Sequence, residues 1–111
     1  LNAQMTTALK QDDLEAWAKA DADFHRALVE RCDNSRIARM AQTVTDQSHR
    51  VRMLTLRLRA KPVASLDEHH AISDAIRRGQ AAEAHDHARR HRIRARDELM
   101  PLLAQFGIKQ L

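Results

Sequence analysis

An amphipathic helical pattern over residues 14–32 is the feature that most constrains the fold. Its apolar residues recur every three or four positions, which is the period of an α-helix, at Leu14, Trp17, Ala18, Phe24, Leu28 and Cys32. Asp21 and His25 fall on the same face, so we expect a carboxylate and an imidazole one helical turn apart to point inward. A buried, unpaired carboxylate is costly, so either a divalent metal or a salt bridge is expected to compensate it.

The rest of the chain is also rich in residues that favour helices. Its 111 residues include only two Gly and two Pro, while Ala, Leu, Arg, Glu and Gln dominate. The length suits one small domain, and no apolar run approaches the ~18 residues of a membrane-spanning helix. We therefore predict one all-α domain over residues 1–111, an antiparallel helical bundle of about five helices.

Capping residues indicate where the helices begin. The first helix is expected to end near Lys10 and to turn inward Leu1, Met5 and Ala8 or Leu9. Asp12 is a predicted N-cap of the next helix, with Glu15 three residues later. Ser65 is a predicted N-cap of the fourth helix, with Glu68 at the matching position of a capping box. In that role the side chain of Glu68 faces outward.

Two of the predicted helices are long. The third is expected to follow a cap at Asn34 or Ser35, to cover residues 35–59 and to turn inward Ile37, Met40, Ala41, Val44, Val51, Leu54 and Leu58. The last is expected to cover residues 81–106 and to stop at Gly107. Because the connections between helices are short, neighbouring helices are predicted to run antiparallel.

Helical periodicity sorts the seven histidines by face. His69 falls on the apolar face of the fourth predicted helix, and His91 falls on that of the last. With Asp21 and His25 they form a set of three imidazoles and one carboxylate, which suits Zn²⁺, Ni²⁺, Mn²⁺ or Fe²⁺. Periodicity gives the direction of each side chain and not its convergence with the others. Three core histidines with separate hydrogen-bond partners are therefore the alternative.

Two arginines of the third predicted helix are candidates for binding a carboxylate. Arg50 and Arg52 lie where the inner face of that helix becomes polar. A guanidinium in such a gap can hold a carboxylate through two parallel hydrogen bonds. The alternative is that each arginine extends its head group to water.

The charge and the cysteine content bear on nucleic-acid binding and on the cellular setting. The net charge is +4, but the arginines are spread over several helices without a run of like charges or an aromatic-lined basic patch. This pattern does not favour direct nucleic-acid binding by the chain. Cys32, which we expect in the core, is the only cysteine, so an intrachain disulfide is excluded and a reducing, cytoplasmic setting is indicated.

Four motifs occur in order between residues 21 and 91, within a pattern that runs from about residue 12 to 111. They are D-x-x-F-H-x-x-L at residues 21–28, Asp-Asn at 33–34, E-H-x-x-I-x-x-A-I-x-x-G at 68–79, and His91 twelve residues after that glycine. Together they resemble the FadR-type C-terminal (FCD) domain of GntR-family transcription regulators. The chain departs from the family pattern at position 33, where the family usually has Gly, and just after Gly79, where a Gln replaces the usual Asp.

The resemblance implies an antiparallel bundle of six or seven helices that senses a small effector. In members that contain a metal, it implies that the ligands are Asp21, His25, His69 and His91. It also implies that an organic-acid effector brings its carboxylate to the metal and to an arginine of the long central helix, in the region of Arg50 and Arg52. We expect the family's N-terminal winged helix-turn-helix and its first bundle helix to lie outside this chain.

The leading interpretation is a ligand-sensing and dimerising domain of a cytoplasmic regulator. We expect it to bind a divalent metal, Zn²⁺ before the others, and a small organic acid, and to reach DNA only through the missing N-terminal domain. One alternative is a metal-dependent enzyme that uses the same three histidines and Asp21. The absence of an obvious general base beside the site, such as an inward Glu, argues against it. Another is a purely structural dimerisation bundle with a satisfied polar core.

Overall fold

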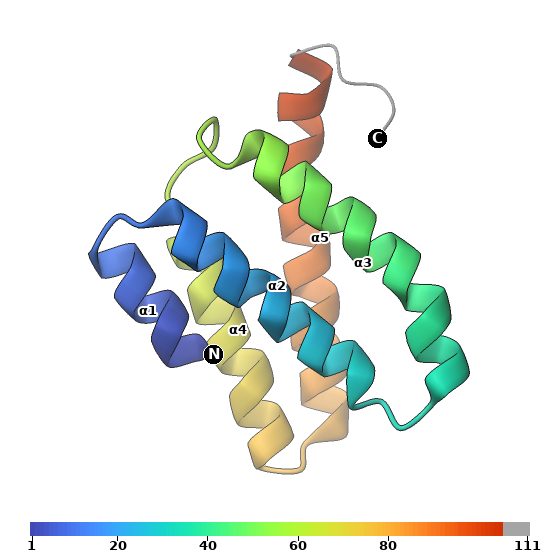
Figure 1. Ribbon diagram of the computed structural model, residues 1–111. Coiled ribbons are helices and arrows are strands. Elements are labelled where there is room, and N and C mark those ends of the chain that lie inside the picture. The colour runs from blue at the N-terminus through green and yellow to red at the C-terminus, as the bar shows by residue number, and fades with distance from the viewer. Residues whose placement is uncertain (106–111) are drawn as a thin grey trace.

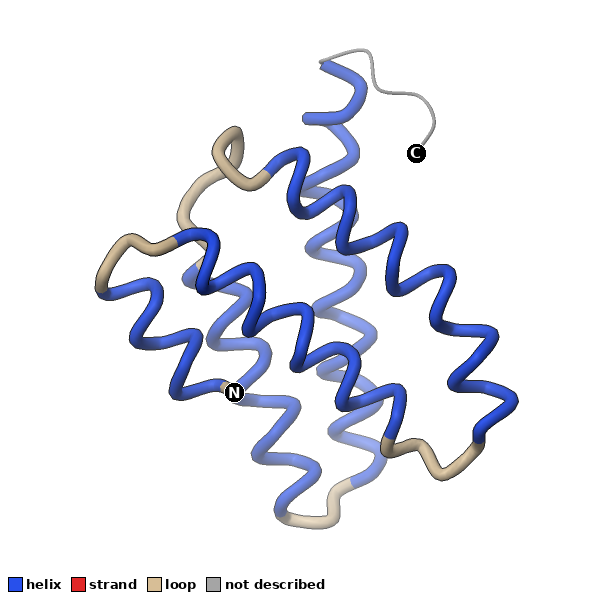
Figure 2. Tube along the Cα trace, in the orientation of Figure 1, coloured by secondary structure: helices blue, strands red, loops and turns tan. Residues whose placement is uncertain are grey.

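The computed structural model describes residues 1–105 of the chain. Over these residues the chain forms five α-helices and no strand (Figure 1, Figure 2): α1 Asn2–Lys10, α2 Leu14–Glu30, α3 Ser35–Thr55, α4 Val63–Arg77 and α5 Ala81–Gln105. The prediction of an all-α bundle is confirmed. Phe106 and Gly107, where the last helix was predicted to end, lie outside the described residues. None of the five helices combines the length and the apolar composition that a membrane span requires.

The helices form two layers. Figure 1 shows α2 between α1 and α3, with α4 and α5 behind these three, and consecutive helices run in opposite directions. α2 contacts α1 and α3, α4 packs against α5 and α1, and α3 also touches α5. The space between the layers is therefore lined by one face of α2 and by the inner faces of α4 and α5.

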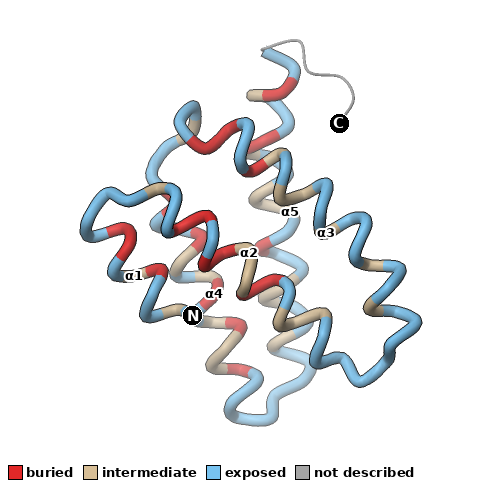
Figure 3. Tube along the Cα trace, in the orientation of Figure 1, coloured by how far each residue is buried: buried red, intermediate tan, exposed pale blue. Residues whose placement is uncertain are grey.

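The apolar core lies mainly where α1 and α2 face α4. It consists of Met5, Ala8, Leu9, Trp17, Ala18, Ala20, Phe24, Leu56 and Ile72, and Figure 3 shows the buried positions on the facing sides of the helices. Three predicted inward residues of α1, Met5, Ala8 and Leu9, are confirmed as buried. Leu1 is exposed, so its predicted inward position is wrong.

Two helices begin at a different residue from the predicted one. Asp13, and not Asp12, caps α2, because its side chain accepts a hydrogen bond from the backbone N–H of Ala16 at 3.0 Å. α4 begins after Pro62, so Ser65 lies inside the helix and its side chain is buried. A proline supplies a backbone φ close to the helical value, which allows the helix to start before the serine.

The middle of the chain shows the largest departures from the prediction. α3 ends at Thr55, because the next residues form a tight turn that brings Leu56 into the core. Several residues of its predicted inward stripe are exposed, namely Ile37, Met40, Val44, Leu54 and Leu58. The reason is that α3 packs only against α2 and α5 within the described residues, so this face has no helix opposite it. Cys32 follows the end of α2 and is exposed, so its predicted core position is wrong.

The turn between α2 and α3 follows the expected chemistry. Asn34 caps α3, with its side-chain oxygen accepting hydrogen bonds from the backbone N–H groups of Arg36 and Ile37, each at 3.1 Å. Asp33 has a φ of 61°, in the left-handed region that glycine adopts most easily. The residue that departs from the family pattern therefore sits where a glycine is favoured.

Candidate metal centre

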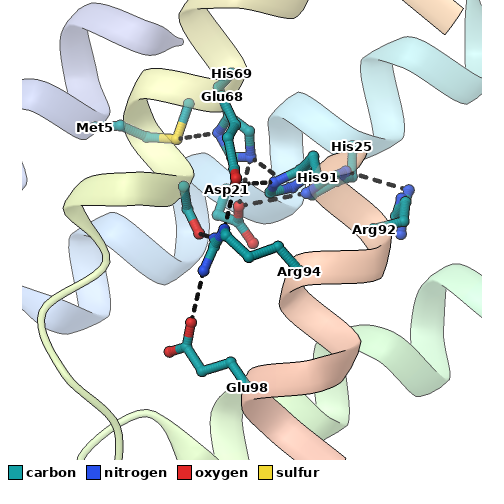
Figure 4. A network of polar contacts seen from close by, with 10 residues as sticks. Met5, Asp21, His25, Glu68, His69, His91, Arg92, Arg94 and Glu98 are labelled. Atoms are coloured by element: carbon teal, nitrogen blue, oxygen red, sulfur yellow. Dashed lines mark hydrogen bonds and ion pairs between the residues drawn. The ribbon is translucent and has the colours of Figure 1, made fainter. Parts of the chain in front are cut away.

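The four predicted ligand residues lie together between the two layers of the bundle. Asp21 and His25 come from α2, His69 from α4 and His91 from α5 (Figure 4). All four are at least 96% buried, with exposed fractions of 1%, 3%, 0% and 4%. One ring nitrogen from each of the three histidines lies within 4.8 Å of the others. Residues far apart in the sequence are thus brought to one small polar centre.

The distances between the donor atoms fit a single ion. Asp21 Oδ1 lies 3.4 Å from His25 Nε2 and 3.4 Å from His69 Nε2, and His69 Nε2 lies 3.2 Å from His91 Nε2. Two ligand atoms that are each ~2.1 Å from one ion lie about 3.0 Å apart at a right angle and about 3.4 Å apart at the tetrahedral angle. The structure therefore spaces these atoms as neighbouring corners of a coordination shell.

The protonation states also suit a cation. Burial lowers the pKa of His25 and His91 below the usual value, and it lowers the pKa of His69 from 6.5 to about 3. Burial by itself would raise the pKa of Asp21, but its contact with His25 and the charge of Arg52 bring that pKa down to about 2. Near neutral pH the centre therefore holds one carboxylate and three neutral imidazoles, and each neutral imidazole has a lone pair on one of its two ring nitrogens.

Arg52 is part of the centre, and Arg50 is not. The Nε atom of Arg52 lies 2.8 Å from Asp21 Oδ2, so α3 contributes a buried cation next to the ligand residues. Within the described residues, Nε and Nη2 of Arg52 and Oδ2 of Asp21 are buried without a hydrogen-bond partner, so the 2.8 Å contact is an ion pair that lacks the geometry of a hydrogen bond. Arg50 lies on the exposed side of α3. A metal ion or a salt bridge was expected to compensate the buried carboxylate of Asp21, and Arg52 provides the salt bridge.

Glu68 contacts the centre, although the sequence pattern placed it outward. Its Oε1 lies 2.6 Å from His91 Nδ1, and its Oε2 accepts a hydrogen bond from Arg94 Nε at 2.5 Å. The error follows from the start of α4, since a helix that begins after Pro62 puts Glu68 in the second turn and not in a cap. One signal in the sequence could have indicated this position. Glu68 directly precedes His69, and the side chains of neighbouring helix residues point only about 100° apart around the helix axis.

The other two histidines have different neighbours behind them. His25 Nδ1 lies 3.3 Å from Nη2 of the exposed Arg92, and His69 Nδ1 lies 3.2 Å from the thioether sulfur of Met5. The ring of Phe24 stacks on His69, with centroids 4.3 Å apart. These contacts hold the rings in place between α1, α2 and α5. The remaining histidines lie outside the centre: His49, His70, His85 and His87.

Comparison with known proteins gives one match. A family model described as FCD domain matches residues 1–95 of the chain, a range that includes all four residues of the centre. No curated protein and no solved structure matches the chain.

Proposed function

The chain belongs to the FCD domain family, and from that premise we propose that it is the ligand-sensing and dimerising domain of a cytoplasmic GntR-family transcription regulator. FCD domains belong to transcription regulators and not to enzymes. DNA contact is then made by a DNA-binding domain joined to this one, and this bundle supplies the signal.

We propose that Asp21, His25, His69 and His91 hold a divalent metal ion. The observation that carries this proposal is the spacing of their donor atoms, 3.2 to 3.4 Å across three contacts from three helices. A mixed nitrogen and oxygen donor set of this kind suits Zn²⁺ first, and Ni²⁺, Mn²⁺ or Fe²⁺ as well. The metal, when bound, supplies a positive charge and a Lewis acid to which a carboxylate is attracted.

The proposed effector is a small organic acid that is bound by Arg52. The guanidinium of Arg52 is buried next to Asp21, and its Nη2 is free of hydrogen bonds within the described part of the chain. Arg92 adds a second positive charge near His25. Once Asp21 faces a divalent cation as well as these two arginines, positive charge exceeds negative charge at the centre, and an anion is favoured there.

Signal transfer needs an effector that prefers one arrangement of the helices. Arg52 belongs to α3, whereas the proposed metal ligands belong to α2, α4 and α5. An acid that contacts Arg52 and the metal together therefore links α3 to the other three helices. The exposed apolar residues Ile37, Met40 and Val44 of α3 support the proposal that this helix also takes part in a homodimer.

The alternative of a metal-dependent enzyme is less well supported. A general base beside the metal, such as a free carboxylate, would support this alternative. Glu68 is the nearest additional carboxylate among the described contacts of the centre, and its two oxygens are engaged by His91 and Arg94. The alternative of a purely structural bundle predicts that metal and chelator leave thermal unfolding unchanged.

Metal analysis of the purified protein, followed by titration of the metal-free protein with Zn²⁺ and Co²⁺, tests the proposal. We expect one ion per chain and loss of binding in His25→Ala, His69→Ala and His91→Ala. His70→Ala is the matched control, because His70 is next to His69 but exposed. Absence of binding by the unaltered protein, or equal binding by His69→Ala and His70→Ala, would contradict it.

A second measurement addresses the effector. In a thermal-shift screen of small carboxylic acids on the zinc-loaded protein, we expect at least one acid to raise the unfolding midpoint. The same acid should act on Arg50→Gln and fail on Arg52→Gln, because only Arg52 lies in the centre. An acid that stabilises both variants equally would exclude Arg52 as its binding residue.

A further inference from the structure

We propose that Glu68 is a positioning residue that fixes His91 in the one tautomer able to bind a metal through Nε2. The inference rests on the proposed metal-binding function and adds to it a residue outside the ligand set. The evidence for it is the hydrogen bond between Glu68 and His91, in which His91 Nδ1 donates, and the contacts that hold Glu68 in place.

The first step is the contact between the two side chains. Glu68 Oε1 lies 2.6 Å from His91 Nδ1, a short distance that marks a strong, charge-assisted hydrogen bond. A carboxylate only accepts hydrogen bonds, so His91 Nδ1 must donate its proton. In a neutral imidazole the other nitrogen then carries the lone pair. That nitrogen, Nε2, is the atom that points into the centre, 3.2 Å from His69 Nε2.

The second step is that Glu68 cannot readily turn away. Its other oxygen accepts a hydrogen bond from Arg94 Nε at 2.5 Å. Arg94 is itself held on both sides, since Nη1 donates to Glu98 and Nη2 donates to Ser65 Oγ, each at 2.8 Å. Figure 4 shows this chain of contacts running from Glu98 through Arg94 and Glu68 to His91. The carboxylate is therefore oriented from behind before any ligand arrives.

The third step is the contrast with the other two histidines. Arg92 can only donate, so it favours the lone pair of His25 on Nδ1, which is directed away from Asp21. Met5 offers His69 Nδ1 only a thioether sulfur, which is a weak acceptor, whereas Asp21 Oδ1 lies 3.4 Å from His69 Nε2 and favours a proton on that nitrogen. Among the three described imidazoles, His91 is thus the one whose tautomer is set for a metal at Nε2. We infer that it is the pre-oriented anchor of the centre.

The substitution Glu68→Gln tests this with almost no change of shape. Arg94 Nε requires an acceptor, so the amide oxygen of the new side chain faces Arg94 and the amide NH₂ faces His91 Nδ1. A donor in that place moves the imidazole proton to Nε2 and removes the lone pair from the centre. We expect the affinity for Zn²⁺ and Co²⁺ to fall by about 10- to 100-fold, the usual effect of losing such an outer partner.

Glu98→Gln is the matched control. It removes the same charge and the same kind of contact to Arg94, but among the described polar contacts Glu98 pairs with Arg94 and not with His91. We expect its metal affinity to equal that of the unaltered protein. If Glu68→Gln and Glu98→Gln bind Zn²⁺ equally well, Glu68 does not position His91 for a metal and the inference is overturned.

Nitrogen NMR of the histidine rings in the metal-free protein shows which ring nitrogen of His91 carries the proton. This observation would not change if Glu68 only stabilised the fold. We expect His91 of the unaltered protein to carry its proton on Nδ1, and on Nε2 in Glu68→Gln. A proton on Nε2 in the unaltered protein overturns the inference even if Glu68→Gln does not fold. If the unaltered protein binds no metal, the proposed function fails, while the ring tautomer still decides whether Glu68 positions His91.

Discussion

Arg52 Nε lies 2.8 Å from Asp21 Oδ2, and this contact joins α3 to α2 inside the bundle. The other oxygen of Asp21 faces His25 and His69. One carboxylate is therefore shared between the proposed effector-binding arginine and the proposed metal ligands. An acid that takes the guanidinium of Arg52 competes for a partner of Asp21, so the two proposed ligands are coupled through this side chain.

The first prediction concerns the stability contributed by this ion pair. In the metal-free protein we expect Arg52→Gln to lower the free energy of unfolding by about 3 kcal/mol, because it leaves a buried carboxylate without its cation. Arg50→Gln is the control and should change it little, since Arg50 is exposed. Urea unfolding in the presence of a chelator measures both.

A double-mutant cycle decides whether the loss comes from the pair itself. Removing both charges, in Asp21→Asn with Arg52→Gln, should cost less than the sum of the two single substitutions. Additive effects would show that the 2.8 Å contact does not contribute to stability in solution.

The second prediction concerns Arg92 and the metal affinity. Arg92 donates toward His25 Nδ1 and favours the tautomer of His25 that keeps a proton on the side of Asp21. We therefore expect Arg92→Ala to raise the affinity for Zn²⁺ by about three- to tenfold, or about 0.7–1.4 kcal/mol. Arg96→Ala is the control, because Arg96 is an exposed arginine one turn further along α5 that pairs with Asp97. Equal gains in both variants would point to net charge and not to the tautomer.

The third prediction concerns the pH dependence of stability without metal. The pKa of His69 is about 3 in the folded protein against an ordinary 6.5, so the unfolded chain takes up the proton first as the pH falls. Stability is then complete above pH 6.5 and is lost below it, by up to about 1.4 kcal/mol per pH unit for each such histidine. Asp21, with a pKa lowered from 3.8 to about 2, adds a further loss as the pH falls below 3.8.

Urea unfolding between pH 7.5 and 4.5 with a chelator present measures this slope. The groups facing His69 are Asp21, His25 and His91, together with the apolar Met5 and Phe24. We expect His69→Gln to flatten the slope, and we expect His70→Gln to leave it unchanged because that residue is exposed. A flat profile in the unaltered protein would mean that the buried histidines are charged in the folded state.

The positions of the four centre residues could be predicted because each depends on the register of a single helix. Asp21, His25, His69 and His91 fall on apolar faces, and a face can be read from spacing alone. Their convergence could not be predicted in this way, because it depends on how α2, α4 and α5 cross. The resemblance to a family supplied that information, and the structure places the three imidazoles together with Asp21 beside them.

The remaining errors come from information that spacing does not contain. The stripe of α3 that includes Met40 shows helical periodicity, but periodicity does not say whether another helix covers it, and within the described residues none does. Glu68 was misplaced because two residues, Pro62 and Ser65, could each start α4. When the start of α4 moves by about one turn, Glu68 no longer caps the helix and instead contacts His91. The role assigned to Glu68 therefore depends on where the helix begins.

The last prediction concerns that exposed stripe of α3. If the face bearing Ile37, Met40 and Val44 lies in a homodimer, Met40→Lys places a charge in the interface and should yield a monomer in sedimentation experiments. Gln42→Lys is the matched control, because Gln42 points to a different side of the same helix and is also exposed. Zinc affinity should be unchanged in both variants, since neither residue contacts the centre. A Met40→Lys protein that keeps the same mass in solution as Gln42→Lys would place the dimer interface elsewhere.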